Sequence, residues 1–76
     1  MRTRLTFPLA FRSERMALDV IRGPGGLMNI GAQAVRLPDE VRAPWRITID
    51  TFRPDAVCRW LANQLPGVEW QRSEMP

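Results

Sequence analysis

Residues 45–67, WRITIDTFRPDAVCRWLANQLPG, are the stretch that decides the fold. Residues 45–51 alternate in polarity, with Trp45, Ile47 and Ile49 on one side, which is the period-2 pattern of a strand with one buried face. Pro54 and Asp55 then favour the start of a helix, because proline has the φ of the first helical position and an acid suits the first turn. The stretch therefore predicts a strand followed directly by a helix.

The predicted helix has a single apolar stripe and a clear end. The stripe consists of Val57, Cys58, Leu61, Ala62 and Leu65. The Pro-Gly pair at 66–67 ends the helix, and the alternation at 68–71 predicts a short strand after it. Strand, helix and strand over roughly 28 residues make a compact βαβ unit.

The first half of the chain repeats this order less clearly. Leu5, Phe7 and Leu9 alternate with polar or small residues and predict a strand over residues 4–11, in which Pro8 requires an edge or a bulge. Residues 13–22 fit either an alternating strand or a helix. Ser13 as N-cap and the Gly-Pro stop at 23–24 favour the helix. The segments FRSE at 11–14 and FRPD at 52–55 also align at an offset of 52 − 11 = 41.

Residues 27–37 alternate like a second strand, and residues 38–44 form a polar connection to Trp45. The resulting order β-α-β-β-α-β predicts an α+β, ferredoxin-like two-layer sandwich, with two helices on one face of a four-stranded antiparallel sheet. The alternative is a four-stranded meander with one C-terminal helix, which follows if residues 13–22 are extended. We expect one domain over residues 1–76, with a frayed tail at 71–76.

Composition limits the chemistry of this chain of 76 residues. It has no histidine and one cysteine, so we expect neither catalysis nor a metal or other cofactor. The net charge of +3, from 11 arginines against 8 acids, is only mildly basic. We expect no signal peptide and no membrane span, and the single cysteine favours a cytoplasmic location.

Several local phrases resemble the ACT-domain class of regulatory modules, in particular the small regulatory subunits of acetohydroxyacid synthase of the isozyme II type. The resemblance covers the strand at 4–11, the helix to residue 22, the phrase Gly-Leu-Met-Asn-Ile at 26–30, Ile-Thr-Ile-Asp at 47–50, and Pro-Gly-Val-Glu at 66–69. The turn after the first strand departs from the Asp/Asn-x-Pro-Gly of many ACT domains, since it reads Phe-Arg-Ser-Glu at 11–14.

This resemblance implies a non-catalytic subunit that docks on a large thiamine-diphosphate enzyme of branched-chain amino acid biosynthesis and tunes it, with an amino acid as effector. The effector site that it implies consists of Arg12, Ser13, Glu14, Met28, Asn29 and Ile30. Helix N–H groups at 13–15 give that site a physical basis as a carboxylate holder. The alternative is that Ser13 is only a cap and Asn29 only a polar strand residue.

Three residues are candidates for contact with a larger protein: Trp60, Trp70 and Arg46. Tryptophan is frequent at binding hot spots, although plain packing of both rings is the alternative. Cys58 lies on the helix stripe and is most simply a small buried hydrophobe, with a reactive thiol as the alternative.

Further interpretations of function stay open. A sheet face with Arg2, Arg4, Thr6, Arg46 and Thr48 is typical of single-strand nucleic acid binding, but the aromatic residues needed for stacking fall on the other face, which favours a solvated charged face. A small inhibitor or adaptor, of the kind that a mobile element encodes, fits the same profile. We also expect a homodimer through the sheet edge formed by residues 27–37.

Overall fold

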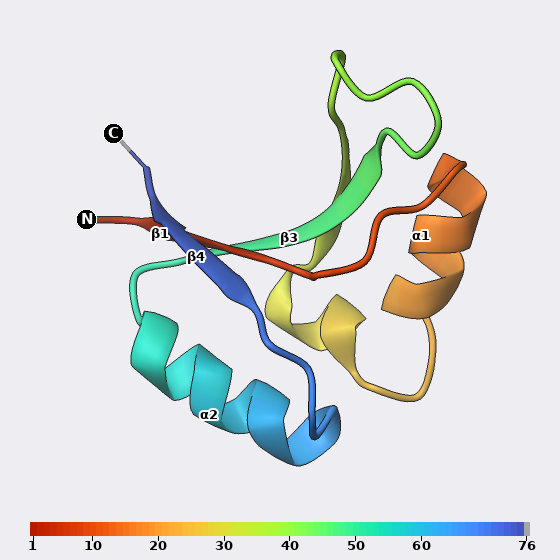
Figure 1. The fold of residues 1–76 in the computed structure, drawn as a ribbon. Helices are drawn as coiled ribbons and strands as arrows, with labels where there is room; N and C mark the ends of the chain where they lie inside the picture. Colours follow the sequence, from red (N-terminus) through yellow and green to blue (C-terminus); the bar gives the residue numbers. More distant parts are fainter. Residues whose placement is uncertain (76) are drawn as a thin grey trace.

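The computed structural model describes residues 1–75 and has two layers (Figure 1). The elements are β1 (Thr3–Thr6), α1 (Glu14–Ile21), the 3-10 helix η1 (Leu27–Ile30), β2 (Gln33–Arg36), β3 (Trp45–Thr51), α2 (Pro54–Gln64) and β4 (Gln71–Glu74). The four strands form one antiparallel sheet in the order β2-β3-β1-β4, and both helices pack on the same face of it. This is the ferredoxin-like arrangement that the sequence predicts, and the meander alternative is wrong.

β3 is the central element of the sheet, since it pairs with β1 on one side and with β2 on the other. Its apolar residues Ile47 and Ile49 are buried beneath the helices. Leu5 of β1 lies opposite Ile49 in the register, so the two strands present a continuous apolar surface. The strand with one buried face that the alternation at 45–51 predicts is therefore confirmed.

Helix α1 begins where the sequence places its cap. The Ser13 hydroxyl accepts a hydrogen bond from the Met16 N–H at 3.3 Å, which satisfies one of the free donors of the first turn. Ala17 and Ile21 are buried and pack with Ile47 in one of the two core clusters. The packing of Ala17 and Ile21 against the sheet explains why this segment is helical, although its sequence also alternates in polarity.

Helix α2 begins at Pro54 and buries Leu61 against the sheet. Leu61 packs with Leu5, Leu27 and Ile49 in the second core cluster. Ala62, the next residue, is exposed, so the apolar stripe is narrower than the sequence predicts.

The strand predicted over residues 27–37 is wrong in its first half. Gly26 and Gly31 adopt φ of +72° and +78°, a region that residues with a Cβ rarely enter. These two left-handed positions turn the chain, and the four residues between them form η1 instead of a strand. The turn places Leu27 in the core, and β2 begins only at Gln33.

The predicted strand over residues 4–11 is also shorter than expected. β1 ends at Thr6 because Pro8, two residues on, has no N–H for a ladder. Phe11 rejoins β3 through an isolated bridge, in which its N–H donates to the Trp45 carbonyl at 2.8 Å. Leu9, predicted on the apolar face, is 62% exposed.

The C-terminal segment differs from the frayed tail predicted over 71–76, of which residue 76 lies outside the described residues. Residues Gln71–Glu74 form β4 beside β1, and the Met75 N–H donates to the Arg2 carbonyl at 2.9 Å. Val68 and Trp70, which alternate in the strand predicted at 68–71, instead pack against the core ahead of β4. Main-chain pairing with β1 thus orders a strand whose side chains are all exposed.

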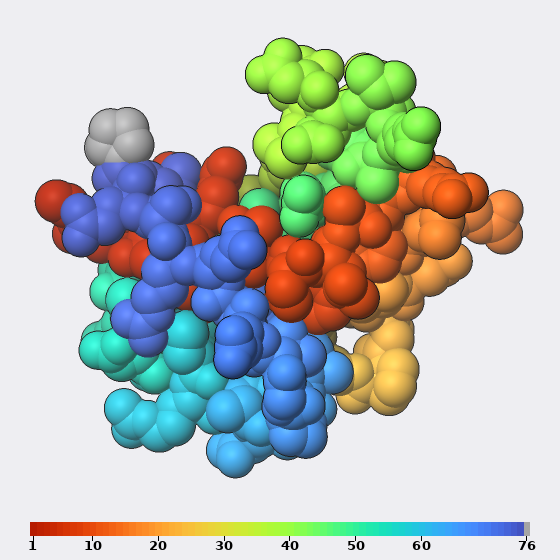
Figure 2. Space-filling model, in the orientation of Figure 1, coloured from red at the N-terminus to blue at the C-terminus, as the bar shows by residue number. Residues whose placement is uncertain are grey.

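The connection between β2 and β3 lies at the surface of the molecule. Residues 37–44 stand out from the body of the molecule and carry Val41, which is 91% exposed (Figure 2). Within residues 1–75, neither helix has the length and apolar character needed to cross a bilayer.

We expect Leu61→Ala to lower the free energy of unfolding by about 2–5 kcal/mol, because it leaves a cavity between α2 and the sheet. Urea denaturation followed by circular dichroism measures this change. Asn63→Ala, on the exposed side of the same helix, is the control and should stay within about 0.5 kcal/mol of the wild type. Equal stability of both variants would contradict the packing of α2.

Candidate functional site

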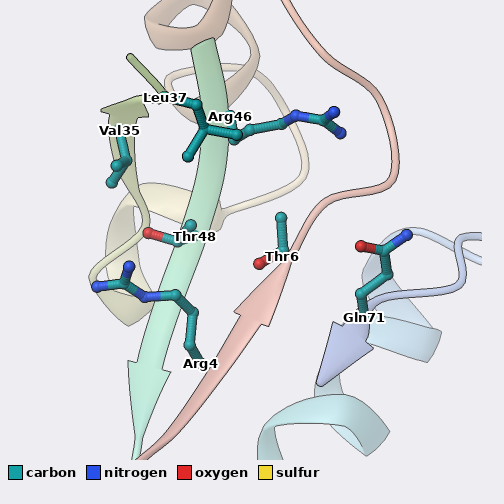
Figure 3. A pocket seen from close by; sticks show the side chains of 7 residues that line it. All are labelled: Arg4, Thr6, Val35, Leu37, Arg46, Thr48 and Gln71. Atoms are coloured by element: carbon teal, nitrogen blue, oxygen red, sulfur yellow. The ribbon is translucent and has the colours of Figure 1, made fainter. Parts of the chain in front are cut away.

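The face of the sheet opposite the helices, called here the open face, contains a hollow of about 280 Å³. The residues that line this open-face hollow come from the four strands and their ends: Arg4, Thr6, Val35, Leu37, Arg46, Thr48 and Gln71. Figure 3 shows the guanidinium groups of Arg4 and Arg46 extending in opposite directions, with the Thr6 and Thr48 side chains between them.

Strand register explains why these side chains meet. Thr6 lies opposite Thr48 on β3 and opposite Gln71 on β4, and Val35 lies opposite Arg46. Residues that lie opposite one another in neighbouring strands project to the same face. Since Ile47 points into the core, its neighbours on β3 project to the open face.

Arg4 is held in place by a salt bridge on the open face. Its Nε donates to Asp50 Oδ1 at 2.9 Å and its Nη2 to Oδ2 at 3.2 Å, and Gln33 Nε2 donates to the same Oδ2 at 3.4 Å. The hydrogen bond from Arg4 lowers the pKa of the Asp50 carboxyl below its usual value, with a smaller contribution from the charge of Arg2. Asp50 is therefore ionised and neutralises Arg4.

Arg46 and Thr48 differ from Arg4 because their polar groups have no partner. Arg46 takes part in no salt bridge within residues 1–75, and its Nε is buried without a hydrogen bond. Thr48 is only 3% exposed, and its Oγ1 also has no hydrogen-bond partner among these residues. Buried polar groups are almost always hydrogen-bonded, so these two groups call for a partner other than residues 1–75, such as an ordered water or a bound molecule.

The lining of the hollow combines one free positive charge with polar and apolar side chains. Arg46 supplies a positive charge, the two threonine hydroxyls and the Gln71 amide supply donors, and Val35 and Leu37 supply an apolar wall. Within residues 1–75, no three His, Cys, Asp or Glu side chains come together as metal ligands.

The effector residues implied by the resemblance fall into two groups, which lie at opposite ends of α1. Arg12, Ser13 and Glu14 lie at the N-terminus of α1, whereas η1, with Met28 and Asn29, follows the turn after its C-terminus (Figure 1). Ser13 acts as the N-cap. Met28 and Asn29 are exposed on η1 rather than placed on a strand.

Ile30, the last of these effector residues, packs against the core cluster of Leu5 and Leu61. Its side chain therefore supports the fold.

The three partner residues predicted from the sequence lie in different surroundings. Trp60 is half-buried beside Gly26, and Trp70 packs edge-on against Phe7 with 5.2 Å between the ring centroids. The Trp70 Nε1 is buried without a hydrogen-bond partner within the described chain. Only Arg46 lines the open-face hollow.

Cys58 of α2 is half-buried and packs against the same core cluster as Leu61, as a small hydrophobic residue does.

A second hollow, of about 330 Å³, lies in the helical layer. Its lining is mostly apolar and comes from the end of α1, the following turn and the end of α2: Asp19, Val20, Gly23, Pro24, Gly25, Leu27 and Leu65. Among the described residues, its lining lacks the unpaired polar groups of the open-face hollow.

The sequence predicts the open face but not the hollow in it. Alternation places Arg4, Thr6, Arg46 and Thr48 together on one face, and the register confirms that placement. Sequence reasoning missed Val35, Leu37 and Gln71. Their signal lies in the pairing of β2 and β4 with distant strands, which one sequence does not reveal.

The fold and the hollow define a small α+β sandwich whose open face has a hollow lined by arginine, threonine, glutamine and aliphatic side chains. In comparisons with known proteins, no family model, no curated protein and no solved structure matches the chain.

We expect Thr48→Val to raise the free energy of unfolding by about 1–2 kcal/mol, because it keeps the β-branched shape but removes an unpaired buried hydroxyl. Thermal or urea denaturation measures the change. Thr3→Val, the same substitution elsewhere on the sheet, is the control. A loss of stability in Thr48→Val would show that this hydroxyl has a hydrogen-bond partner in the folded chain.

Asp50 should make stability depend on pH. Because its pKa is lowered in the folded state, its contribution is complete above the ordinary value of 3.8 and is lost as the pH falls through the lowered value. Melting temperatures of the wild type and Asp50→Asn should therefore differ at about pH 6 and converge towards about pH 2. Asp39→Asn, in the exposed connection 37–44, is the control, and a constant difference across this range would contradict the salt bridge.

Proposed function

We propose that this protein is a non-catalytic interaction subunit that binds a larger protein and tunes its activity. The observation that carries the proposal is the open face, which no helix covers and which has an excess of positive charge. Arg2, Arg4 and Arg46 share this face, whereas the only acid that alternation places there within residues 1–75 is Asp50. Since Asp50 is occupied by Arg4, the free charge of the face is that of Arg2 and Arg46.

An acidic surface is the partner chemistry that complements this face. Charge complementarity across an interface raises association rates and suppresses wrong partners. A narrower version follows from the resemblance to ACT-like subunits, namely a regulatory subunit of acetohydroxyacid synthase that responds to a branched-chain amino acid. The ferredoxin-like order of elements supports that version at the level of fold.

The positive face also has the charge to attract nucleic acid, but its aromatic residues are in the wrong place for stacking. Phe7, Phe11, Trp45 and Trp70 pack into the cluster on the helical side of the sheet. Single-stranded nucleic acid binding relies on aromatic rings exposed on the binding face. This placement favours a protein partner.

A second proposal concerns two copies of the chain. β2 lies at one edge of the sheet and pairs with a neighbour on one side only. Its free main-chain groups are a template for a second strand, which supports a homodimer through this edge. We place the protein in the cytoplasm, where a single cysteine stays reduced.

The test of the proposed function is affinity capture from the native host with two matched variants. The double variant Arg2→Glu/Arg46→Glu reverses charge on the open face, and Arg15→Glu/Arg59→Glu makes the same change on the exposed sides of the helices. We expect capture of a defined larger protein by the wild type and the helix variant, with about tenfold less on the open-face variant.

Both variants must melt cooperatively, and the captured protein must form a complex with the pure chain on size exclusion. Equal capture by both variants would contradict docking through the open face. Capture that disappears after nuclease treatment would favour nucleic acid as the partner.

A further inference from the structure

The open-face hollow contains two buried polar groups that have no hydrogen-bond partner within residues 1–75. Thr48 is almost fully buried although no helix lies over it, and its Oγ1 has no partner in residues 1–75. The Arg46 Nε is also buried and also has no hydrogen-bond partner within the described chain. Leaving such groups unpaired is costly, so a ligand that accepts hydrogen bonds would recover that cost.

We propose that the open-face hollow is a binding site for a small carboxylate that carries a short apolar body. An ionised carboxylate accepts hydrogen bonds only, which matches a hollow whose free groups are the guanidinium of Arg46 and the hydroxyl of Thr48. Hydrogen bonds between charged groups are roughly twice as strong as neutral ones, so the carboxylate is the part of the ligand that fixes its position.

The apolar body follows from the rest of the lining. Val35 and Leu37 lie on one side of the hollow (Figure 3), and Leu37 is exposed to solvent. A short alkyl chain would cover both side chains and remove apolar surface from water. The volume of about 280 Å³ limits the ligand to a small molecule.

The charge of the hollow argues against an ammonium group on the ligand. Asp50 is the acid nearest to the hollow by register, and both of its oxygens accept hydrogen bonds from Arg4. An α-amino group would therefore meet Arg46 without a free carboxylate to balance it. The hollow is thus expected to prefer plain carboxylates to amino acids.

This site goes beyond the proposed function, because the isolated chain should bind the carboxylate with no partner present. It also lies on the face that we propose for docking, so a bound carboxylate would change the charge that the partner meets.

The test is a titration of the isolated chain, followed by 1H-15N NMR and by thermal shift, with acetate, butanoate, hexanoate, butanamide, 2-aminobutanoate and inorganic phosphate. We expect butanoate to shift the signals of Thr48 and Arg46, and hexanoate to bind more tightly than acetate. Butanamide, 2-aminobutanoate and phosphate should each bind about tenfold or more weakly than butanoate.

Two variants with matched controls locate the site. Arg46→Gln and Thr48→Val should each weaken butanoate binding by about tenfold. Arg59→Gln removes the same charge from α2, Thr3→Val makes the same change outside the hollow, and neither should alter binding. Equal binding of butanamide, preference for phosphate, or unchanged binding in Arg46→Gln and Thr48→Val would overturn the proposal.

Discussion

The opposite chemistry of the two faces of β3 is the constraint on which the structure depends. Ile47 and Ile49 can be buried only if both helices lie on their side of the sheet. Arg46 and Thr48 alternate with them and are therefore committed to the open face. A shift of one residue in register would move a charge into the core, so the fold and the hollow are specified together.

The open face combines one salt bridge with two polar groups that have no hydrogen-bond partner within the described chain. Arg4 and Asp50 neutralise each other and fix part of the surface. Arg46 and Thr48 have no such partner within the described chain, and the burial of the Thr48 hydroxyl works against stability. Surfaces retained for binding commonly carry such a cost, because the groups that a ligand needs are unpaired until it arrives.

Sequence periodicity was sufficient to predict the regular helices and strands. It failed where a single glycine or proline determines the backbone conformation. The strand at 45–51 and the helices at 14–21 and 54–64 follow from alternation, caps and apolar stripes. Gly26, Gly31 and Pro8 end or prevent strands through φ and a missing N–H, which outweigh the apolar pattern. The hollow needed pairings between distant strands, so Val35 and Gln71 were out of reach of a local pattern.

The central claim is that binding takes place on the open face and leaves the helical layer free. Modification of arginine by phenylglyoxal, read by mass spectrometry on the free chain and on its complex with the larger protein, tests it most directly in a chain whose basic side chains are all arginine. The account predicts that Arg2 and Arg46 become protected in the complex while Arg15 and Arg59 stay reactive. Protection of Arg15 and Arg59, with Arg2 and Arg46 unchanged, would contradict it.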